Sequence, residues 1–280
     1  MSKALVWLRR DLRIDDHAAL YHALKLHAQV YVAFVFDTDI LDALPDKYDR
    51  RVEFIWESLN ELKLALQQKG GDLLIHHGKA IEEIPRLAQQ LEVAAVYANR
   101  DYEPLAIARD EKVAQALLRV DKTLHLFKDQ VLFEQDEILT QTGKPYGVFT
   151  PYKRAHLAKL NPFYLKAYPV QRYLKSLAGG KAESMPSLES MGFSCTNLKT
   201  MRLPTGIKGA QQLFDDFLQR IEDYHDARNY PAIKGVSYLS VHLRFGTISI
   251  RQLAHAAWQL SLAGNEGAAT WLSELIWRDF

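Results

Sequence analysis

The sequence has almost no cysteine and no long apolar run, and these two absences exclude two classes of protein. Its single cysteine, Cys195, cannot form an internal disulfide, which excludes a disulfide-stabilised scaffold and favours a reducing compartment. No apolar stretch approaches the ~20 residues that a membrane-spanning helix needs. The apolar run Ala4–Leu8 is too short for the core of a signal peptide. These features predict a soluble protein of the cytoplasm that has no membrane partner.

Excess charge and metal-ligand patterns are also absent. The 35 lysines and arginines are balanced by 34 aspartates and glutamates, for a formal net charge of +1. Any nucleic-acid site must therefore be a local basic patch. The ten histidines show no HxxxH or Cys/His ligand spacing, which predicts no metal site. No GxGxxG follows a predicted strand and no GxSxG nucleophile elbow occurs, so a nicotinamide dehydrogenase is disfavoured.

The sequence does contain a regular alternation of short apolar runs and amphipathic stretches. Apolar runs without polar alternation are typical of strands buried on both faces, and they occur at 4–8, 30–36, 72–76 and 95–97. A fifth run, 123–127, alternates more and is predicted to lie nearer an edge. Helical periodicity occupies 50–69, 81–91 and 105–120. This order predicts an α/β fold with a doubly wound, parallel, five-stranded sheet.

Composition divides the chain into three predicted parts. Residues 1–130 hold the sheet, residues 131–208 are a connector, and residues 209–280 have a helical texture. Within the connector, residues 161–208 are irregular and are predicted to lie over the surface with one short helix at most. In the helical part, Ser249 is the predicted N-cap of a helix at 250–262, and Thr270 is predicted to begin or cap the last helix.

Ligand-binding residue types are densest between Tyr224 and Phe280. The turn Gly235–Ser240 (GVSYLS) combines a glycine with hydroxyl residues ahead of a helix, which can supply backbone N–H groups and hydroxyls to a phosphate. Taken alone, an ordinary loop that caps a helix explains it better. Near the first strand, residues 9–16 hold three arginines and three aspartates. This nearly neutral set favours ion pairs at the strand end over a phosphate site.

Two sets of residues in this region are spaced for one helical face. Tyr224 and Arg228 are four residues apart, and Trp271, Glu274 and Arg278 recur at intervals of three and four. A lone tryptophan is more often part of a core. A carboxylate and a guanidinium on its face are harder to explain that way, because buried charges are costly unless they are paired or bind a ligand.

Five segments of the chain carry a recognisable pattern, in order. They are VWLRRDLRIDDHAAL at the first strand, NRDYEP at 99–104, YGVFTPY at 146–152, RNYPAIKGVSYLSVHLRFGTIS at 228–249 and WLSELIWRDF at 271–280. Together they resemble the DNA photolyase/cryptochrome family, with most similarity to the class I cyclobutane-dimer photolyases of bacteria. The resemblance extends over all 280 residues and implies an antenna-type α/β domain followed by the first helices of an all-α FAD-binding domain. It also implies light-driven repair of pyrimidine dimers in DNA by electron transfer from reduced FAD.

The resemblance assigns a role to each matching residue. Arg228 corresponds to an arginine on the DNA backbone, Glu274 to the carboxylate that hydrogen-bonds the damaged bases, and Trp277 to the wall on which the flipped dimer stacks. Glu274 and Trp277 are thus the expected catalytic residues. The expected FAD-binding residues are Tyr224, Ser237, Leu239, Ser240, Trp271 and Arg278.

Several positions depart from the family pattern. Val236 replaces a usual threonine and removes one phosphate hydroxyl, and His156 stands where a tryptophan is frequent. Leu105 and Ala106 replace residues that folate-binding members carry. The antenna pigment therefore remains open between methenyltetrahydrofolate and a deazaflavin, for which Asp101 and Glu103 are the expected contacts. No obligate protein partner is indicated.

The resemblance also sets an expectation for the last helix. Family members continue past the segment WRDF, so the chain is expected to be the N-terminal part of a photolyase. The apolar residues of the last helix, Leu272, Leu275 and Ile276, are then expected to lack partners. Residues 209–280 are expected to be loosely packed and to hold little FAD. The alternatives are a cryptochrome-like photoreceptor and a non-catalytic antenna-domain fragment. Glu274 and Trp277 favour repair over signalling.

Overall fold

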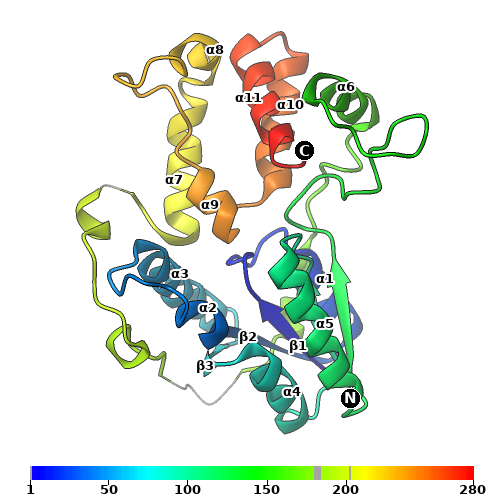
Figure 1. Ribbon diagram of the computed structural model, residues 1–280, viewed down its shortest axis with the longest axis vertical. Helices are drawn as coiled ribbons and strands as arrows, with labels where there is room; N and C mark the ends of the chain where they lie inside the picture. The colour runs from blue at the N-terminus through cyan, green and yellow to red at the C-terminus, as the bar shows by residue number, and fades with distance from the viewer. Residues whose placement is uncertain (1, 180–183, 202) are drawn as a thin grey trace.

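The computed structural model describes residues 2–179, 184–201 and 203–280. Its first part is a sheet of five parallel strands in the order β3-β2-β1-β4-β5. The predicted parallel α/β class is confirmed, and β5 lies at an edge as its alternation predicts (Figure 1). The strands are β1 Lys3–Leu8, β2 Gln29–Asp37, β3 Leu73–Gly78, β4 Ala95–Asn99 and β5 Thr123–Phe127.

Helices cover both faces of this sheet, as a doubly wound fold requires. Apolar side chains of α1 and α3 pack on one face, and those of α4 and α5 pack on the other. Helix α3 begins where the Asp49 carboxylate accepts a hydrogen bond from the Arg51 amide at 2.8 Å. The helices are α1 Ala18–Leu26, α2 Thr38–Leu41, α3 Arg50–Gln67, α4 Ala80–Gln90 and α5 Pro104–Leu118. The short helices α1 and α2 have no counterpart among the predicted elements.

Most described residues of 161–208 lie at the surface as predicted, but the segment is anchored by a few buried residues, and it has three short 3-10 helices where one at most was expected. Val170, Phe193 and Leu198 are 1 to 3% exposed and belong to the apolar core beneath α1 and α3. The buried apolar residues of this segment are isolated in the sequence and fill separate gaps in that core. No periodic pattern in the sequence therefore predicts their burial. The predicted connector 131–208 contains α6 Phe149–Lys159 and the 3-10 helices η1 Val170–Ser176, η2 Glu189–Met191 and η3 Leu198–Met201. Residues 180–183 and 202 of the predicted connector lie outside the described part of the chain.

The last part of the chain is helical and has a core of its own, to which α6 also contributes. Ser249 caps α10 as predicted, because its hydroxyl accepts a hydrogen bond from the Arg251 amide at 3.1 Å. The prediction for Thr270 is wrong. Asn265 caps α11 five residues earlier by accepting from the Ala268 amide at 2.7 Å, because packing against η4 extends the helix toward its N-terminus. The elements are α7 Gly206–Leu218, η4 Ile221–Asp223, α8 Tyr224–Ala227, α9 Ser240–Phe245, α10 Ile250–Leu262 and α11 Glu266–Trp277.

The expectation that the apolar residues of the last helix lack partners is also wrong. Leu272, Leu275 and Ile276 are at most 4% exposed and lie in the helical core. Helix α11 packs mainly on α10 and α8, with further contacts to η4 and α6 (Figure 1). These neighbours precede α11 in the sequence, and helical spacing does not reveal that they surround it.

A buried network of charged side chains joins the sheet to the helical part. Arg251 of α10 donates to Asp16 at 2.8 Å and to Asp129 at 2.7 Å, and Arg13 donates to Asp129 at 2.6 Å. All four side chains are at most 8% exposed. The acidic and basic residues that follow β1 therefore form ion pairs, as their near-neutral balance predicts.

His242 of α9 makes this interface sensitive to pH. Its buried ring lies against Phe54 of α3, and its Nδ1 is 2.7 Å from the Thr247 hydroxyl. Burial lowers the pKa of His242 from 6.5 to about 4.

We expect the free energy of unfolding to fall by about 2 kcal/mol between pH 7 and pH 5, because the unfolded imidazole takes up a proton that the folded one does not. This stability is complete above pH 6.5 and is lost as the pH falls toward 4. Urea unfolding of His242→Gln at both pH values tests it. A fall of the same size in this variant would assign the effect to other groups.

Candidate functional site

The residues singled out between 224 and 280 lie on α8, on the loop that follows it, and on α11. Helix α11 runs beside α8 and η4, which brings residues about 46 positions apart in the sequence into contact (Figure 1). The clearest such contact is an ion pair in which Arg228 donates to the Glu274 carboxylate at 2.6 Å. The two side chains are 30% and 34% exposed, so solvent can reach the pair.

Tyr224 extends this pair into the helical core. The Arg228 guanidinium lies 5.4 Å from the centre of the Tyr224 ring, so the two residues meet even though α8 is a single turn. The hydrogen bond that Arg228 donates to Glu274 raises the pKa of the Arg228 guanidinium. Arg228 is therefore fixed in place by a carboxylate and an aromatic face together.

Trp271 is placed deeper than the other residues of this group. It is 3% exposed and packs against Phe214 and Phe217 of α7. Tyr224 is 6% exposed and meets Phe217 edge to face, with ring centres 5.5 Å apart. Both residues, predicted to bind FAD, thus belong to the packed aromatic core in this structure. Any contact with a ligand must use the parts of these rings that remain at the edge of that core.

Trp277 lies at the end of α11 and is 47% exposed. Its indole stacks on Phe149 at the start of α6, with ring centres 3.6 Å apart and planes 10° apart. Phe280 meets it edge to face. One face of Trp277 is therefore covered by Phe149, and the exposed remainder is available as a flat surface.

The turn before α9 presents hydroxyl groups to solvent. Leu239 is 1% exposed and anchors the turn in the helical core, whereas Ser240 is exposed and Ser237 is half-buried. The Ser237 hydroxyl accepts a weak hydrogen bond from the Leu239 amide at 3.4 Å. Tyr238 between them has a left-handed backbone, with φ of +57°. Among the described residues, the Ser240 hydroxyl has no hydrogen-bond partner, and the Ser237 hydroxyl has this weak one alone.

Arg278, at the end of α11, contacts α9. Its guanidinium donates to the carbonyls of Gln130 at 3.0 Å and Leu243 at 3.4 Å. Within the described part of the chain it forms no ion pair with a carboxylate. Burial lowers the pKa of Arg278, and the neighbouring charges of Arg10 and Arg244 oppose Asp279 and lower it further. A guanidinium in such surroundings is suited to an anionic ligand, whose charge would offset this repulsion.

The predicted antenna residues lie next to the same arginines. Asp101 is buried and accepts from Arg10 at 3.1 Å, and Glu103 accepts from Arg10 at 3.0 Å and from Arg244 of α9. Glu103 thus forms salt bridges with both arginines, and its carboxylate is not free in this structure. Arg244 is a member of this cluster that the sequence analysis did not identify, because nothing in its spacing links it to residues 101–103.

A metal site finds no support in the described residues. Residues 2–179, 184–201 and 203–280 hold no cluster of three or more side chains that could bind a metal. Cys195 is exposed and free. Among the described helices, none is both long and apolar enough to cross a membrane.

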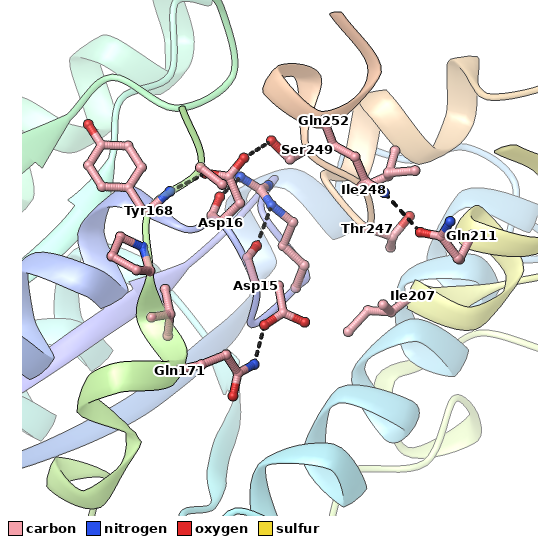
Figure 2. A pocket seen from close by; sticks show the side chains of 14 residues that line it. Asp15, Asp16, Tyr168, Gln171, Ile207, Gln211, Thr247, Ile248, Ser249 and Gln252 are labelled. Atoms are coloured by element: carbon pink, nitrogen blue, oxygen red, sulfur yellow. Dashed lines mark hydrogen bonds between the residues drawn. The ribbon is translucent and has the colours of Figure 1, made fainter. Parts of the chain in front are cut away.

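A cavity of about 410 Å³ opens between the loop after β1, residues 167–171 and the helices α7 and α10 (Figure 2). No described residue of α8 or α11 lines it. Several of its polar side chains are bonded to one another. Asp15 accepts from Gln171, the Ser249 hydroxyl donates to Asp16, and Gln252 donates to Gln211 at 2.9 Å. None of the predicted site residues is among the described residues that line it.

The comparisons with known proteins agree on one family. The family model described as DNA photolyase matches residues 4–172. A deoxyribodipyrimidine photo-lyase of Synechococcus sp. is 35% identical over 99% of this chain, which covers 59% of that relative. An uncharacterized 31.6 kDa protein of another Synechococcus strain is also 35% identical, and here the match covers 98% of the relative. The chain thus spans about three fifths of the length of the named relative.

Solved structures show the same fold. A class III photolyase from Agrobacterium tumefaciens aligns with a TM-score of 0.86 and 27% identity over 100% of this chain and 58% of its own. A photolyase from Sulfolobus tokodaii with two FAD molecules aligns at 0.73 and 26%, over 99% and 58% of the two chains. A cryptochrome from Synechocystis sp. aligns at 0.85 over 100% and 60%, and its 21% identity carries the fold alone.

Proposed function

This chain belongs to the DNA photolyase family, and from that premise we propose that it acts in light-driven repair of cyclobutane pyrimidine dimers in DNA. The observation that carries the proposal is the 35% identity over 99% of this chain to a deoxyribodipyrimidine photo-lyase. The arrangement of α8, the loop and α11 supports it. An exposed tryptophan and a carboxylate lie near the end of α11, and an arginine at the end of the neighbouring α8 contacts that carboxylate.

The residues around α9 fit a bound FAD. Ser237 and Ser240 present hydroxyls with at most one weak hydrogen bond, and Arg278 has no carboxylate partner among the described residues. These groups would hold the diphosphate, whose charge and oxygens suit hydroxyls and a guanidinium fork. Tyr224, Leu239 and Trp271 would form the apolar surroundings. When bound in its reduced form and illuminated, FAD supplies the electron that opens the dimer.

Three side chains would handle the DNA. Arg228 would meet a backbone phosphate, and its positive charge and 30% exposure support this role. Glu274 would hydrogen-bond the damaged bases, and the exposed part of Trp277 would offer a surface for stacking. A pyrimidine dimer must leave the duplex to reach such a site, and photolyases are among the enzymes that flip bases. A second, antenna chromophore near Asp101 and Glu103, either a deazaflavin or methenyltetrahydrofolate, completes the proposal.

The absorption spectrum of the purified protein and a photorepair assay together test this function. The expected results are the vibronic bands of bound flavin and loss of dimers from irradiated DNA under blue light only. Bound reduced flavin without repair would favour a cryptochrome-like photoreceptor. A colourless protein, or one with an antenna pigment alone, would favour a non-catalytic domain.

Substitutions of Arg228 and Glu274 are expected to separate phosphate binding from base recognition. Arg228→Ala should weaken binding to damaged and undamaged duplexes alike and lower the slope of log K against log salt by about one. Glu274→Gln should instead reduce the preference for damaged DNA, because base contacts and not phosphate contacts discriminate. Lys208→Ala removes an exposed charge elsewhere and serves as control. Loss of dimer preference alone in Arg228→Ala would contradict the assignment.

A further inference from the structure

Arg220 makes an unusual set of contacts just after α7. Its guanidinium donates to the carbonyls of Lys234 and Val236, both at 2.8 Å. It also donates to the Asp216 carbonyl and carboxylate, both at 2.6 Å. The side chain is 19% exposed. Hydrogen bonds from a charged donor are roughly twice as strong as neutral ones, so this side chain ties residues 234–236 firmly to the end of α7.

The loop it holds, residues 229–238, has few other attachments. Its described backbone hydrogen bonds are short-range, such as those from Tyr230 N to Ala227 O and from Ile233 N to Tyr230 O. The side chains of Tyr230, Ile233, Val236 and Tyr238 are 39 to 62% exposed. A cavity of about 390 Å³ lies beneath the loop, lined in part by Arg220 and Ile233. The loop therefore borders this cavity, and side-chain packing contributes little to its stability.

Two further attachments are weaker or purely steric. Lys234 pairs with Asp216 at 2.8 Å, but the two side chains are 58% and 37% exposed, and such pairs contribute little. Gly235 lies so close to α8 that an added Cβ would sit 2.3 Å from the Ala227 carbonyl oxygen. That contact limits how near the loop can come without holding it there. Arg220 is the group that holds it.

The held residues lead directly into the Ser237–Ser240 turn. Val236, whose carbonyl accepts a hydrogen bond from Arg220, directly precedes Ser237. Tyr238, the residue after Ser237, has a left-handed backbone. Non-glycine residues keep such a conformation only where their surroundings impose it. A turn ordered before its ligand arrives binds more tightly, because the entropy of ordering has already been lost.

We propose that Arg220 is a positioning residue that pre-orders the Ser237–Ser240 turn for the diphosphate of FAD. It acts through the backbone of residues 234–236 and does not itself touch the cofactor. This inference rests on the proposed function, in which that turn binds FAD. None of the five segments that carry the family resemblance includes Arg220.

Hydrogen exchange and FAD titration of Arg220→Ala test the inference. We expect amide exchange over 234–240 to be about tenfold faster in the protein without FAD, and the Kd for FAD to rise about tenfold, which corresponds to about 1.4 kcal/mol. Arg220→Lys should recover part of the affinity, because an ammonium group can still reach one of the carbonyls. Lys208→Ala, which removes an exposed charge from the same α7 helix, should leave both measurements unchanged.

The outcomes separate this inference from the proposed function. FAD uptake by the unsubstituted protein with an unchanged Kd in Arg220→Ala would overturn the inference alone. Unchanged exchange over 234–240 would overturn it as well, since the turn would then be ordered without Arg220. Absence of FAD uptake by the unsubstituted protein would contradict the proposed function and this inference with it.

Discussion

Replacement of Arg251 by leucine is expected to lower the free energy of unfolding by about 3–5 kcal/mol, the range observed when one partner of a buried ion pair is removed. Arg251 is the cation shared by Asp16 and Asp129, and these side chains are 6%, 8% and 0% exposed. Without it, Asp16 loses its salt-bridge partner, and Asp129 keeps Arg13 alone. Solvent cannot compensate carboxylates at this depth. Chemical denaturation at pH 7 gives the measurement.

A matched control separates burial from the mere presence of a bridge. Arg244 also joins the helical part to the sheet through Glu103, but the two side chains are 49% and 53% exposed. Arg244→Leu is therefore expected to change stability by about 0–1 kcal/mol. Equal losses in the two variants would show that burial is not the decisive factor.

The same network predicts a pH dependence. Burial would raise the pKa of Asp129, but the charges of Arg13, Arg251 and His17 outweigh burial and hold that pKa well below its ordinary value. The folded form therefore gives up this proton more readily than the unfolded form does. The resulting stability is present above the unfolded pKa of about 3.9 and is lost as the pH falls further. The difference between wild type and Asp129→Asn should accordingly narrow below about pH 4.

Replacement of Gly246 by alanine is expected to be nearly as damaging, at about 2–5 kcal/mol. Gly246 ends α9 with φ of +66°, a left-handed conformation that costs other residues roughly 1–2 kcal/mol. An added Cβ would also lie 2.2 Å from the Arg10 carbonyl oxygen and 2.5 Å from the Asp11 Cα. Overpacking of this kind costs about 1–3 kcal/mol, and the backbone of the loop after β1 cannot easily move away. Thermal and urea unfolding measure the sum.

Gly264→Ala isolates the conformational part of this effect. Gly264 has φ of +88° and nothing lies within 4 Å of the position its Cβ would take. Its substitution should therefore show the strain of the left-handed backbone without the clash. A loss at Gly246 no larger than that at Gly264 would show that the contact with the loop after β1 is soft.

The amino-acid sequence determined the sheet and several details of the helical part. Uninterrupted apolar runs indicated the strands, and the alternating run at 123–127 indicated an edge, because a strand at the edge is less completely covered. The run at 72–76 was expected to be buried on both faces, but β3 forms the other edge of the sheet and is only partly buried. Ser249 was identifiable as a helix cap from its chemistry and place alone. Five ordered segments indicated the family, which the comparisons confirm. Each of these signals is local in the sequence, so no knowledge of distant neighbours was needed.

Only the tertiary structure decided which distant residues meet. The start of α11 at Asn265, the burial of Leu272, Leu275 and Ile276, and the anchoring of residues 161–208 all depend on surfaces remote in the sequence. The contacts of Arg228 with Glu274, Arg244 with Glu103 and Arg251 with Asp129 join residues 46 to 141 positions apart. Charged side chains carry no periodic signature of their partners, since an ion pair requires only that two groups meet in space. Helix packing, and not local propensity, determined which of these charged residues are in contact.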